Sequence, residues 1–189
     1  MPKPLRIAGI SGSLRKDSYN TAAIRAAMEL APEGVQIELH LLHDIPPFNQ
    51  DTEAEGWPRA VQHLRERVAA ADGLLLATPE YNHSAPGVLM NALDWLARPP
   101  GQGPVEGKPL AIIGASESIT GTARAQAQLR QYAFYNHMPL VTHAELLIGE
   151  AKFDSARGII DPATREFLAS MLLSFADRIR RAERQKAAA

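Results

Sequence analysis

The stretch "LRIAGISGSLRKDSYNTAAIRAAMELA", residues 5–31, places a strand, a polar loop and a helix in direct succession. Residues 5–10 form an apolar run of strand length, and residues 20–31 carry the alanine-rich pattern typical of a helix that stops near Pro32 and Gly34. In parallel α/β sheets, ligands bind beyond the carboxyl ends of the strands. The polar loop between this strand and this helix is therefore the first candidate site.

The rest of the chain repeats the alternation of strands and helices. Residues 35–42 alternate apolar and polar side chains, which predicts a strand with four apolar residues on one face (Val35, Ile37, Leu39 and Leu41). Continuous apolar runs at 73–78 and 108–116 are typical of buried parallel strands, and 138–148 is the last expected strand. Helices are expected at 57–71, 85–97, 122–136 and from Asp161 onward, and Asp44–Gly56 is expected to be a long loop. We therefore expect residues 1–189 to form a single three-layer α/β domain with a mostly parallel sheet.

Composition narrows the function classes. The 189 residues are 46% hydrophobic, carry a formal net charge of −1 and include no cysteine. The near-zero charge argues against nucleic acid as a partner, and the missing thiols exclude disulfides and cysteine catalysis. No segment has the pattern of a secretory signal or the length of a membrane span, so we expect a cytoplasmic protein that does not bind membranes.

The first loop is rich in hydrogen-bond donors and matches neither the P-loop nor the dinucleotide fingerprint. Its donors stand just before and within the first turn of a helix, where unpaired amides attract an anion (Ser11, Ser13, Arg15, Ser18, Asn20 and Thr21). Gly9 and Gly12 are expected to let the backbone turn tightly. A helix cap explains one or two such residues, whereas six favour a site for a terminal monophosphate.

Two further polar loops follow the next two apolar runs. The sequence "PEYNHSAPG", residues 79–87, could border a planar heteroaromatic ring, and "SESITGT", residues 116–122, could contact the same ring or a hydroxylated chain. Each loop alone fits an ordinary surface turn. Because all three polar loops follow expected parallel strands, one shared ligand is the better interpretation.

Three segments in this order, "GSLRKDSYNT", "TPEYNHSAPGVLMNALDW" and "GASESITGTARAQAQLRQ", closely resemble the NADPH-dependent FMN reductase family. The resemblance runs from about Leu5 to about Ile148. It implies a flavodoxin-like fold with a five-stranded parallel sheet in the order 2-1-3-4-5, and FMN as cofactor with NADPH or NADH as hydride donor. It also implies quinones, azo compounds, flavins or chromate as small-molecule acceptors, and a homodimer or homotetramer.

The resemblance also assigns residues to the cofactor. The phosphate would be held by Ser11, Ser13, Arg15, Ser18, Asn20 and Thr21. The isoalloxazine would be lined by Pro79, Glu80, Tyr81 and Asn82, and closed on the far side by Ser116, Ser118 and Gly121. Two residues depart from the family pattern, since Met90 stands where a lysine is common and Thr122 where a second glycine is common.

No catalytic side chain and no metal site is expected. His40 and His43 are expected to face solvent at a strand end, with no further ligand group beside them. This fits an enzyme whose cofactor carries the chemistry, with donor and acceptor sharing one site in a ping-pong mechanism. Two other functions stay open from the sequence: a flavodoxin-like electron carrier without its own NAD(P)H reaction, and a phosphoesterase or sugar-phosphate binder that uses the same anion loop.

Overall fold

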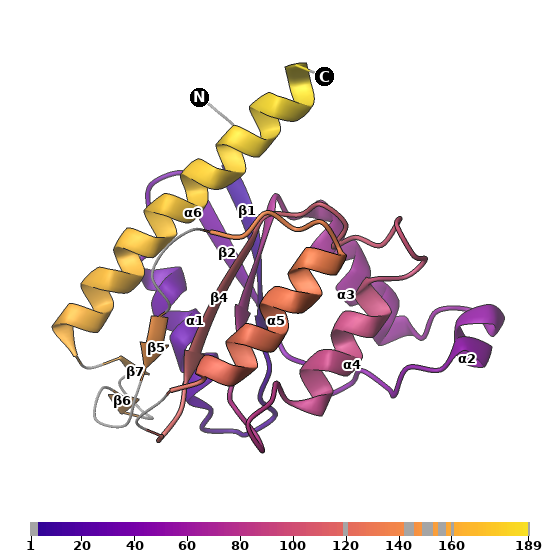
Figure 1. Ribbon diagram of the computed structural model, residues 1–189, viewed down its shortest axis with the longest axis horizontal. Helices are drawn as coiled ribbons and strands as arrows, with labels where there is room; N and C mark the ends of the chain where they lie inside the picture. The colour runs from indigo at the N-terminus through magenta and orange to yellow at the C-terminus, as the bar shows by residue number, and fades with distance from the viewer. Residues whose placement is uncertain are drawn as a thin grey trace.

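A computed structural model describes residues 4–118, 121–141, 146–148, 153–154, 158–159 and 161–188 of the protein. Strands and helices alternate along most of the chain (Figure 1). In chain order the elements are β1 (Leu5–Ser11), α1 (Tyr19–Glu29), β2 (Val35–His40), α2 (Gln50–Glu55), α3 (Arg59–Ala70), β3 (Gly73–Ala77), α4 (Gly87–Leu96), β4 (Leu110–Ala115), α5 (Ala123–Tyr135), β5 (Leu146–Ile148), β6 (Phe153–Asp154), β7 (Gly158–Ile159) and α6 (Pro162–Ala188).

The main sheet has five parallel strands in the order β2-β1-β3-β4-β5, which confirms the expected flavodoxin-like topology. The chain enters β1 at the top of Figure 1, so the carboxyl ends of the strands lie at the lower edge of that view. Strands β6 and β7 form a separate antiparallel pair. The switch in strand order falls between β1 and β3, where such sheets place their ligands.

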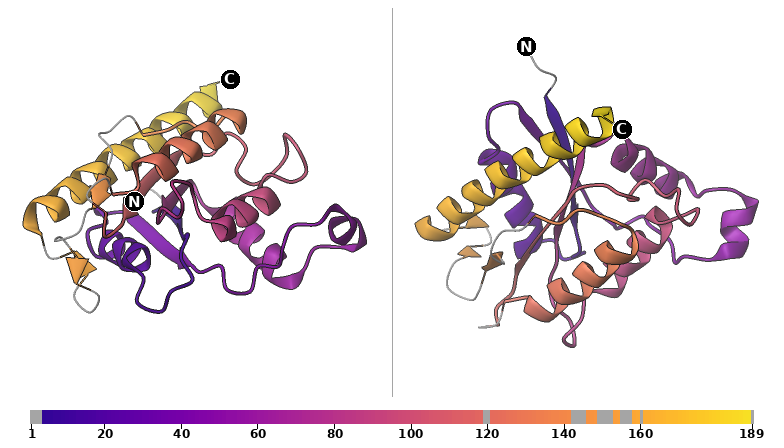
Figure 2. Two further views of the ribbon diagram at one scale, coloured as in Figure 1. Left: turned by 60° about the horizontal axis from the view of Figure 1, so that its bottom comes forward. Right: turned by 45° about the horizontal axis from the view of Figure 1, so that its top comes forward.

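Helices cover both faces of the sheet, with α1 and α6 on one side and α3, α4 and α5 on the other (Figures 1 and 2). Strand β3 shows why its sequence is continuously apolar, because its neighbouring side chains enter two different cores. Leu75 belongs to the core that includes Phe175 of α6, whereas Leu74 and Leu76 belong to the core that includes Leu93 of α4. The expected pattern of a central strand buried on both faces is confirmed.

The expected long loop at Asp44–Gly56 contains the short helix α2 and packs on its own chain. Asn49 caps α2 by accepting a hydrogen bond from the Asp51 amide. The ring of Phe48 meets the ring of Trp95 edge-on, with 4.9 Å between the ring centres, and the Trp95 Nε1 donates to the Pro46 carbonyl. These contacts hold the segment against α4, although α2 itself projects from the body in every view (Figure 2).

Other expectations need correction. Strand β5 covers only Leu146–Ile148 of the expected 138–148, where Leu140 forms a single bridge and residues 142–145 lie outside the described residues. Leu41 lies beyond the end of β2 and is exposed. Gly9 and Gly12 serve close packing rather than a turn, because a Cβ at either would come within 2.9 Å of Ile24 or Leu89.

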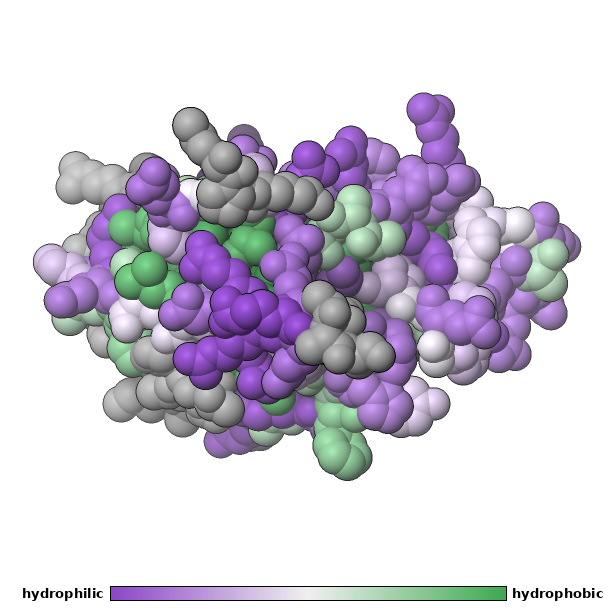
Figure 3. Space-filling model, turned by 90° about the horizontal axis from the view of Figure 1, so that it is seen from above, coloured by the Kyte–Doolittle hydropathy of each residue, from purple (hydrophilic) through white to green (hydrophobic). Residues whose placement is uncertain are grey.

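The end of the molecule opposite the three loops is mainly hydrophilic. Figure 3, which looks onto the top of Figure 1, shows hydrophobic side chains there only in small separate areas. Among the described helices, none combines the length and the apolar character needed to cross a membrane.

Candidate functional site

The three polar loops meet at the carboxyl edge of the sheet and enclose a cavity of about 160 Å³. In Figure 1 these loops lie at the lower edge of the main sheet. The lining consists of Ser13, Arg15, Ser18, Tyr19, Asn20, Pro79, Glu80, Tyr81, Ala115, Ser116 and Glu117. Eight of the thirteen sequence-predicted site residues are therefore brought to one cavity.

The start of α1 provides the anion-binding part of the cavity. Ser18 caps the helix, and its Oγ accepts a hydrogen bond of 3.2 Å from the Thr21 amide. Ser13 Oγ accepts in the same way from the Arg15 amide at 3.3 Å. Because both serine oxygens act as acceptors, each hydroxyl keeps its proton to donate to a ligand. The cap and the anion site predicted from the sequence are thus compatible roles of the same residues.

Three of the six expected phosphate donors are used inside the framework. The hydroxyls of Ser11 and Thr21 are both buried and lie 2.8 Å apart. The Asn20 amide donates to the Ala115 carbonyl and accepts from the Ala115 amide, both at 2.9 Å. Asn20 thereby fixes the first loop to the end of β4, and its contribution to the site is positional.

Arg15 is the cation of the cavity. Its guanidinium lies 5.7 Å from the centre of the Tyr19 ring, and no carboxylate among the described residues pairs with it. A guanidinium without a counter-ion, next to a helix amino terminus, is well suited to bind a phosphate.

The second loop contains a tight hairpin turn. Tyr81 and Ser84 exchange two backbone hydrogen bonds of 3.0 Å, and the two residues between them, Asn82 and His83, have φ angles of 50° and 62°. Positive φ at both central positions is the geometry of a type I′ turn. The turn presents Tyr81, which is 48% exposed, at the rim, whereas Asn82 shapes the turn and does not line the cavity.

Glu80 joins the second loop to the start of α5 through its side chain, which is only 7% exposed. Its carboxylate accepts from the backbone amides of Arg124 and Ala125 at the start of α5, and from the Arg124 guanidinium at 3.1 Å. Burial alone would raise the pKa of Glu80, but these hydrogen bonds and the nearby positive charge outweigh it and lower the pKa. Glu80 is thus a charged clamp behind the cavity.

The third loop contributes through its first residues. Ser116 lines the cavity and accepts from the Ser118 amide at 3.1 Å, while Ser118 and Gly121 lie outside the lining. Tyr19, Ala115 and Glu117 line the cavity and were not predicted. Tyr19 stands between two predicted residues in the first turn of α1, and Glu117 follows Ser116 directly, so their positions in the loops were the available signal.

The profile of the NADPH-dependent FMN reductase family matches residues 5–153. The chain belongs to this family. It is 47% identical over 174 residues to the NAD(P)H-dependent FMN reductase of Pseudomonas aeruginosa, covering 91% of this chain and 94% of that one. It is 37% identical over 186 residues to the quinone reductase of Escherichia coli K12, covering 96% and 98%. Among solved structures, the flavoenzyme NAD(P)H:(acceptor) oxidoreductase FerB from Paracoccus denitrificans is similar with a TM-score of 0.83 and 36% identity, covering 94% and 98%.

Membership in the FMN reductase family makes this protein an oxidoreductase that works with FMN and a reduced nicotinamide. The two departures from the family pattern both lie away from the cavity. Thr122 is fully buried, and its Oγ1 takes the space that a Cβ at Gly114 would need, 1.7 Å away. Met90 is half-buried and packs against the core beneath α4. Neither residue lines the cavity.

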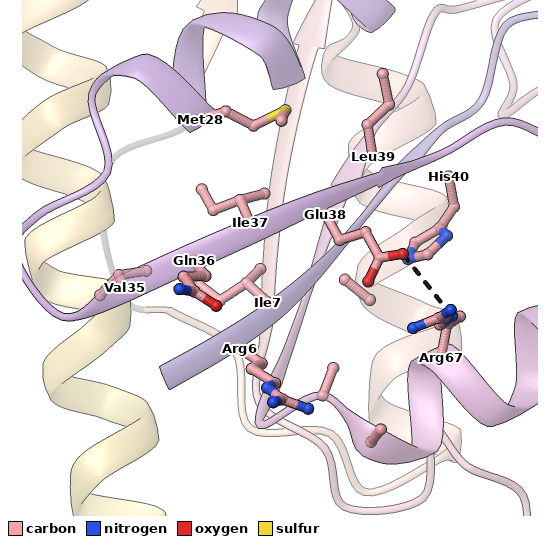
Figure 4. Close-up of a pocket in the computed structure, with 13 residues that line it drawn as sticks. Arg6, Ile7, Met28, Val35, Gln36, Ile37, Glu38, Leu39, His40 and Arg67 are labelled. Atoms are coloured by element: carbon pink, nitrogen blue, oxygen red, sulfur yellow. Dashed lines mark ion pairs between the residues drawn. The ribbon is translucent and has the colours of Figure 1, made fainter. Parts of the chain in front are cut away.

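A second and larger hollow, of about 770 Å³, lies at the free edge of the sheet between α1, β2 and α3. Figure 4 shows Met28 and Ile37 on one side of β2, and Glu38, His40 and Arg67 on the other. The hollow contains none of the predicted site residues and straddles an edge strand, so the smaller cavity is the functional candidate.

The two histidines near β2 differ in their surroundings. His40 is buried, which corrects the expectation that it faces solvent, whereas His43 is exposed and its Nε2 lies 3.1 Å from the Leu14 carbonyl. Within the described residues, no group of three or more metal-ligating side chains is present.

Proposed function

We propose that the protein is an FMN-dependent NAD(P)H oxidoreductase whose FMN binds in the three-loop cavity, and that quinones are its acceptors. The observation that supports this proposal best is the combination of Arg15, Ser13 and Ser18 at the start of α1 with Tyr81 and Ser116 from two other loops in one cavity. An anion site beside an aromatic rim suits a phosphate joined to a ring system.

The chemistry of the donor set fits FMN. Arg15 and the proton-bearing hydroxyls of Ser13 and Ser18 would hold the phosphate, since they offer one cation and two neutral donors to a dianion. Pro79, Tyr81 and Ser116 would border the rest of the molecule. The cavity is smaller than pockets that enclose a whole ligand of this size, so part of such a ligand would remain open to solvent.

FMN, when bound, accepts a hydride from a reduced nicotinamide and passes it to an acceptor. The part played by this chain is to bind and orient. Backbone N–H groups of the second and third loops would stabilise negative charge on the reduced ring. An open ring face shared by the nicotinamide and the acceptor leads us to expect ping-pong kinetics.

Quinones are the first acceptor class to test. A 2-hydroxy-1,4-benzoquinone reductase of a Burkholderia species is 39% identical to this chain over 178 residues, covering 93% and 97%. Azo compounds, free flavin and chromate are further acceptors for which we expect activity. Exposed Phe134 and Tyr135 at the end of α5 support our expectation of a homodimer or homotetramer, since large exposed aromatic side chains favour protein contacts.

Anaerobic addition of NADPH or NADH to the FMN-loaded protein tests the proposal. We expect rapid bleaching of the flavin absorbance and its recovery when a benzoquinone is added. An oxidised spectrum that persists with both nicotinamides would favour the electron-carrier alternative. Failure to bind FMN at saturating concentration would contradict both and favour a phosphoesterase or sugar-phosphate binder.

A further inference from the structure

Two carboxylates line the candidate cavity, and they have different surroundings. Glu80 is nearly buried and its charge is balanced by Arg124 and by the amides at the start of α5. Glu117 is exposed, and its one described partner is the neutral hydroxyl of Tyr19, which donates to Glu117 Oε1 at 3.2 Å. Within the described parts of the chain, no cation pairs with Glu117. Among the described residues, no ion pair therefore compensates its negative charge.

Tyr19 separates this charge from the cation that would neutralise it. Its hydroxyl contacts Glu117, and its ring lies 5.7 Å from the Arg15 guanidinium. Arg15 and Glu117 consequently line the same cavity of about 160 Å³ without forming an ion pair. A dianion bound at Arg15 would therefore share a small space with a second negative charge.

We propose that Glu117 is a specificity-determining residue of the cofactor site. Its carboxylate lowers the affinity for flavins that carry a dianionic phosphate, relative to flavins with a neutral tail, and so keeps FMN exchangeable. This inference rests on the proposed function, because it takes the phosphate to bind at Arg15 and Ser18. The repulsion acts through charge across the cavity and needs no direct contact with the phosphate.

The expected size of the effect follows from Coulomb's law. A unit charge and a dianion separated by several ångströms in a largely aqueous setting repel enough to change affinity about fivefold. Such repulsion between solvent-accessible charges is screened by salt, so it weakens when the Debye length falls below the separation. A charge effect can therefore be recognised by its dependence on ionic strength and on the charge of the ligand.

The test is an equilibrium titration of apoprotein with FMN and with riboflavin, followed by quenching of flavin fluorescence at low and at high salt. We expect Glu117→Gln to tighten FMN binding about fivefold at low salt and distinctly less at high salt, with riboflavin binding unchanged. Glu33→Gln is the matched control. It removes one negative charge from an exposed residue at the opposite edge of the sheet, before β2, and FMN affinity should stay the same.

The variant Tyr19→Phe distinguishes the effect of the Glu117 charge from the effect of its hydrogen bond with Tyr19. It removes the bond to Glu117 and keeps the carboxylate, so a change in FMN affinity of less than about twofold is expected. A gain as large as that of Glu117→Gln would overturn the assignment to charge.

Other outcomes of the titration also decide between the hypotheses. If Glu117→Gln tightens FMN and riboflavin equally, or weakens FMN, then Glu117 acts on the ring or on the hydroxylated chain and the inference is wrong. If Glu117→Gln leaves FMN affinity unchanged, the inference fails while the phosphate site stands. If neither the native protein nor the variant binds FMN, the proposed function itself is wrong.

Discussion

The hollow at the free sheet edge and the cavity at the carboxyl edge differ in size, in chemistry and in the origin of their residues. The hollow of about 770 Å³ is lined mainly by β2 and its immediate neighbours in β1, α1 and α3. The cavity of about 160 Å³ takes its lining from three loops that are far apart in the sequence, after β1, β3 and β4. Only the smaller one combines a cation, capping hydroxyls and a helix amino terminus.

The volume of a hollow is a poor indicator of the ligand site in a parallel α/β sheet. The larger hollow follows from having an edge strand, because no neighbouring strand fills the space beyond β2. The smaller one follows from topology, because the carboxyl ends of parallel strands bring their loops to one edge. We therefore expect substitutions at the small cavity to change FMN binding and substitutions at the larger hollow to change stability.

The largest expected effect comes from a matched pair of arginines. Arg15→Ala removes the cation of the small cavity, and we expect FMN affinity to fall about 30-fold, the loss of about 2 kcal/mol from a charge-assisted contact. Arg67→Ala, at the edge hollow, should change FMN affinity less than about twofold. Tyr81→Ala should weaken FMN by about threefold, since it removes rim contact without removing charge. Equal retention of FMN by the Arg15 and Tyr81 variants would contradict the phosphate site.

The sequence was sufficient to locate this edge of the sheet. Apolar runs such as 73–78 mark strands by composition alone, and polar residues directly after them mark loops at the carboxyl ends. The strand order was predicted from the resemblance to the reductase family, because the hydrophobic pattern of a sequence locates strands but does not give their order in the sheet. Both expectations are confirmed by the parallel sheet.

The roles within the loops could not be predicted, because they depend on partners that are distant in the sequence. Asn20 was expected to bind phosphate, but it bonds to the backbone of Ala115, which only the folded sheet brings near. Glu80 was expected beside the ring and does line the cavity, but the contact of its carboxylate with the start of α5 was not predicted. His40 follows Leu39 in β2, so the alternation predicts that the two side chains lie on opposite faces of the sheet. The sequence does not show that the face with His40 is buried.

One Glu–Arg ion pair lies at each of the two hollows, and the two pairs differ in exposure. Glu80 and Arg124 form the pair behind the small cavity, where the Glu80 side chain is 7% exposed, whereas the Glu38 side chain at the edge hollow is 58% exposed and lies 3.8 Å from Arg67. We expect Glu80→Gln to lower the free energy of unfolding by about 1.5 kcal/mol, since charge-assisted hydrogen bonds to α5 are weakened. Glu38→Gln should cost less than about 0.5 kcal/mol, because exposed pairs contribute little. Urea denaturation at neutral pH measures both.

The pH dependence of the Glu80 contribution has a definite sign. Because the folded state lowers the pKa of Glu80, its stabilising effect is complete above the ordinary pKa of a glutamate and is lost as the pH falls through the lower folded value. The stability difference between native protein and Glu80→Gln should therefore narrow in acid. A difference that stays constant down to the acid transition would show that the carboxylate is not the group responsible.

His40 is the buried histidine of the edge hollow. It is 8% exposed, and its Nε2 has no hydrogen-bond partner among the described residues. Burial lowers the pKa of His40, and the positive charge of Arg67 and the neighbouring His63 act in the same direction, while Glu38 opposes them. The folded state therefore resists protonation of this ring, and the unfolded chain binds the proton more readily.

This linkage predicts that the protein loses stability as the pH falls below about 6.5, where the unfolded histidine becomes protonated. The slope for one such group is at most about 1.4 kcal/mol per pH unit. His40→Phe keeps a ring of similar size and removes the titration, so its loss of stability between pH 7.5 and 5.5 should be smaller than that of the native protein. Because His40 does not line the small cavity, FMN affinity measured at neutral pH should be the same for His40→Phe and for the native protein, and a fall would contradict the division of roles between the two hollows.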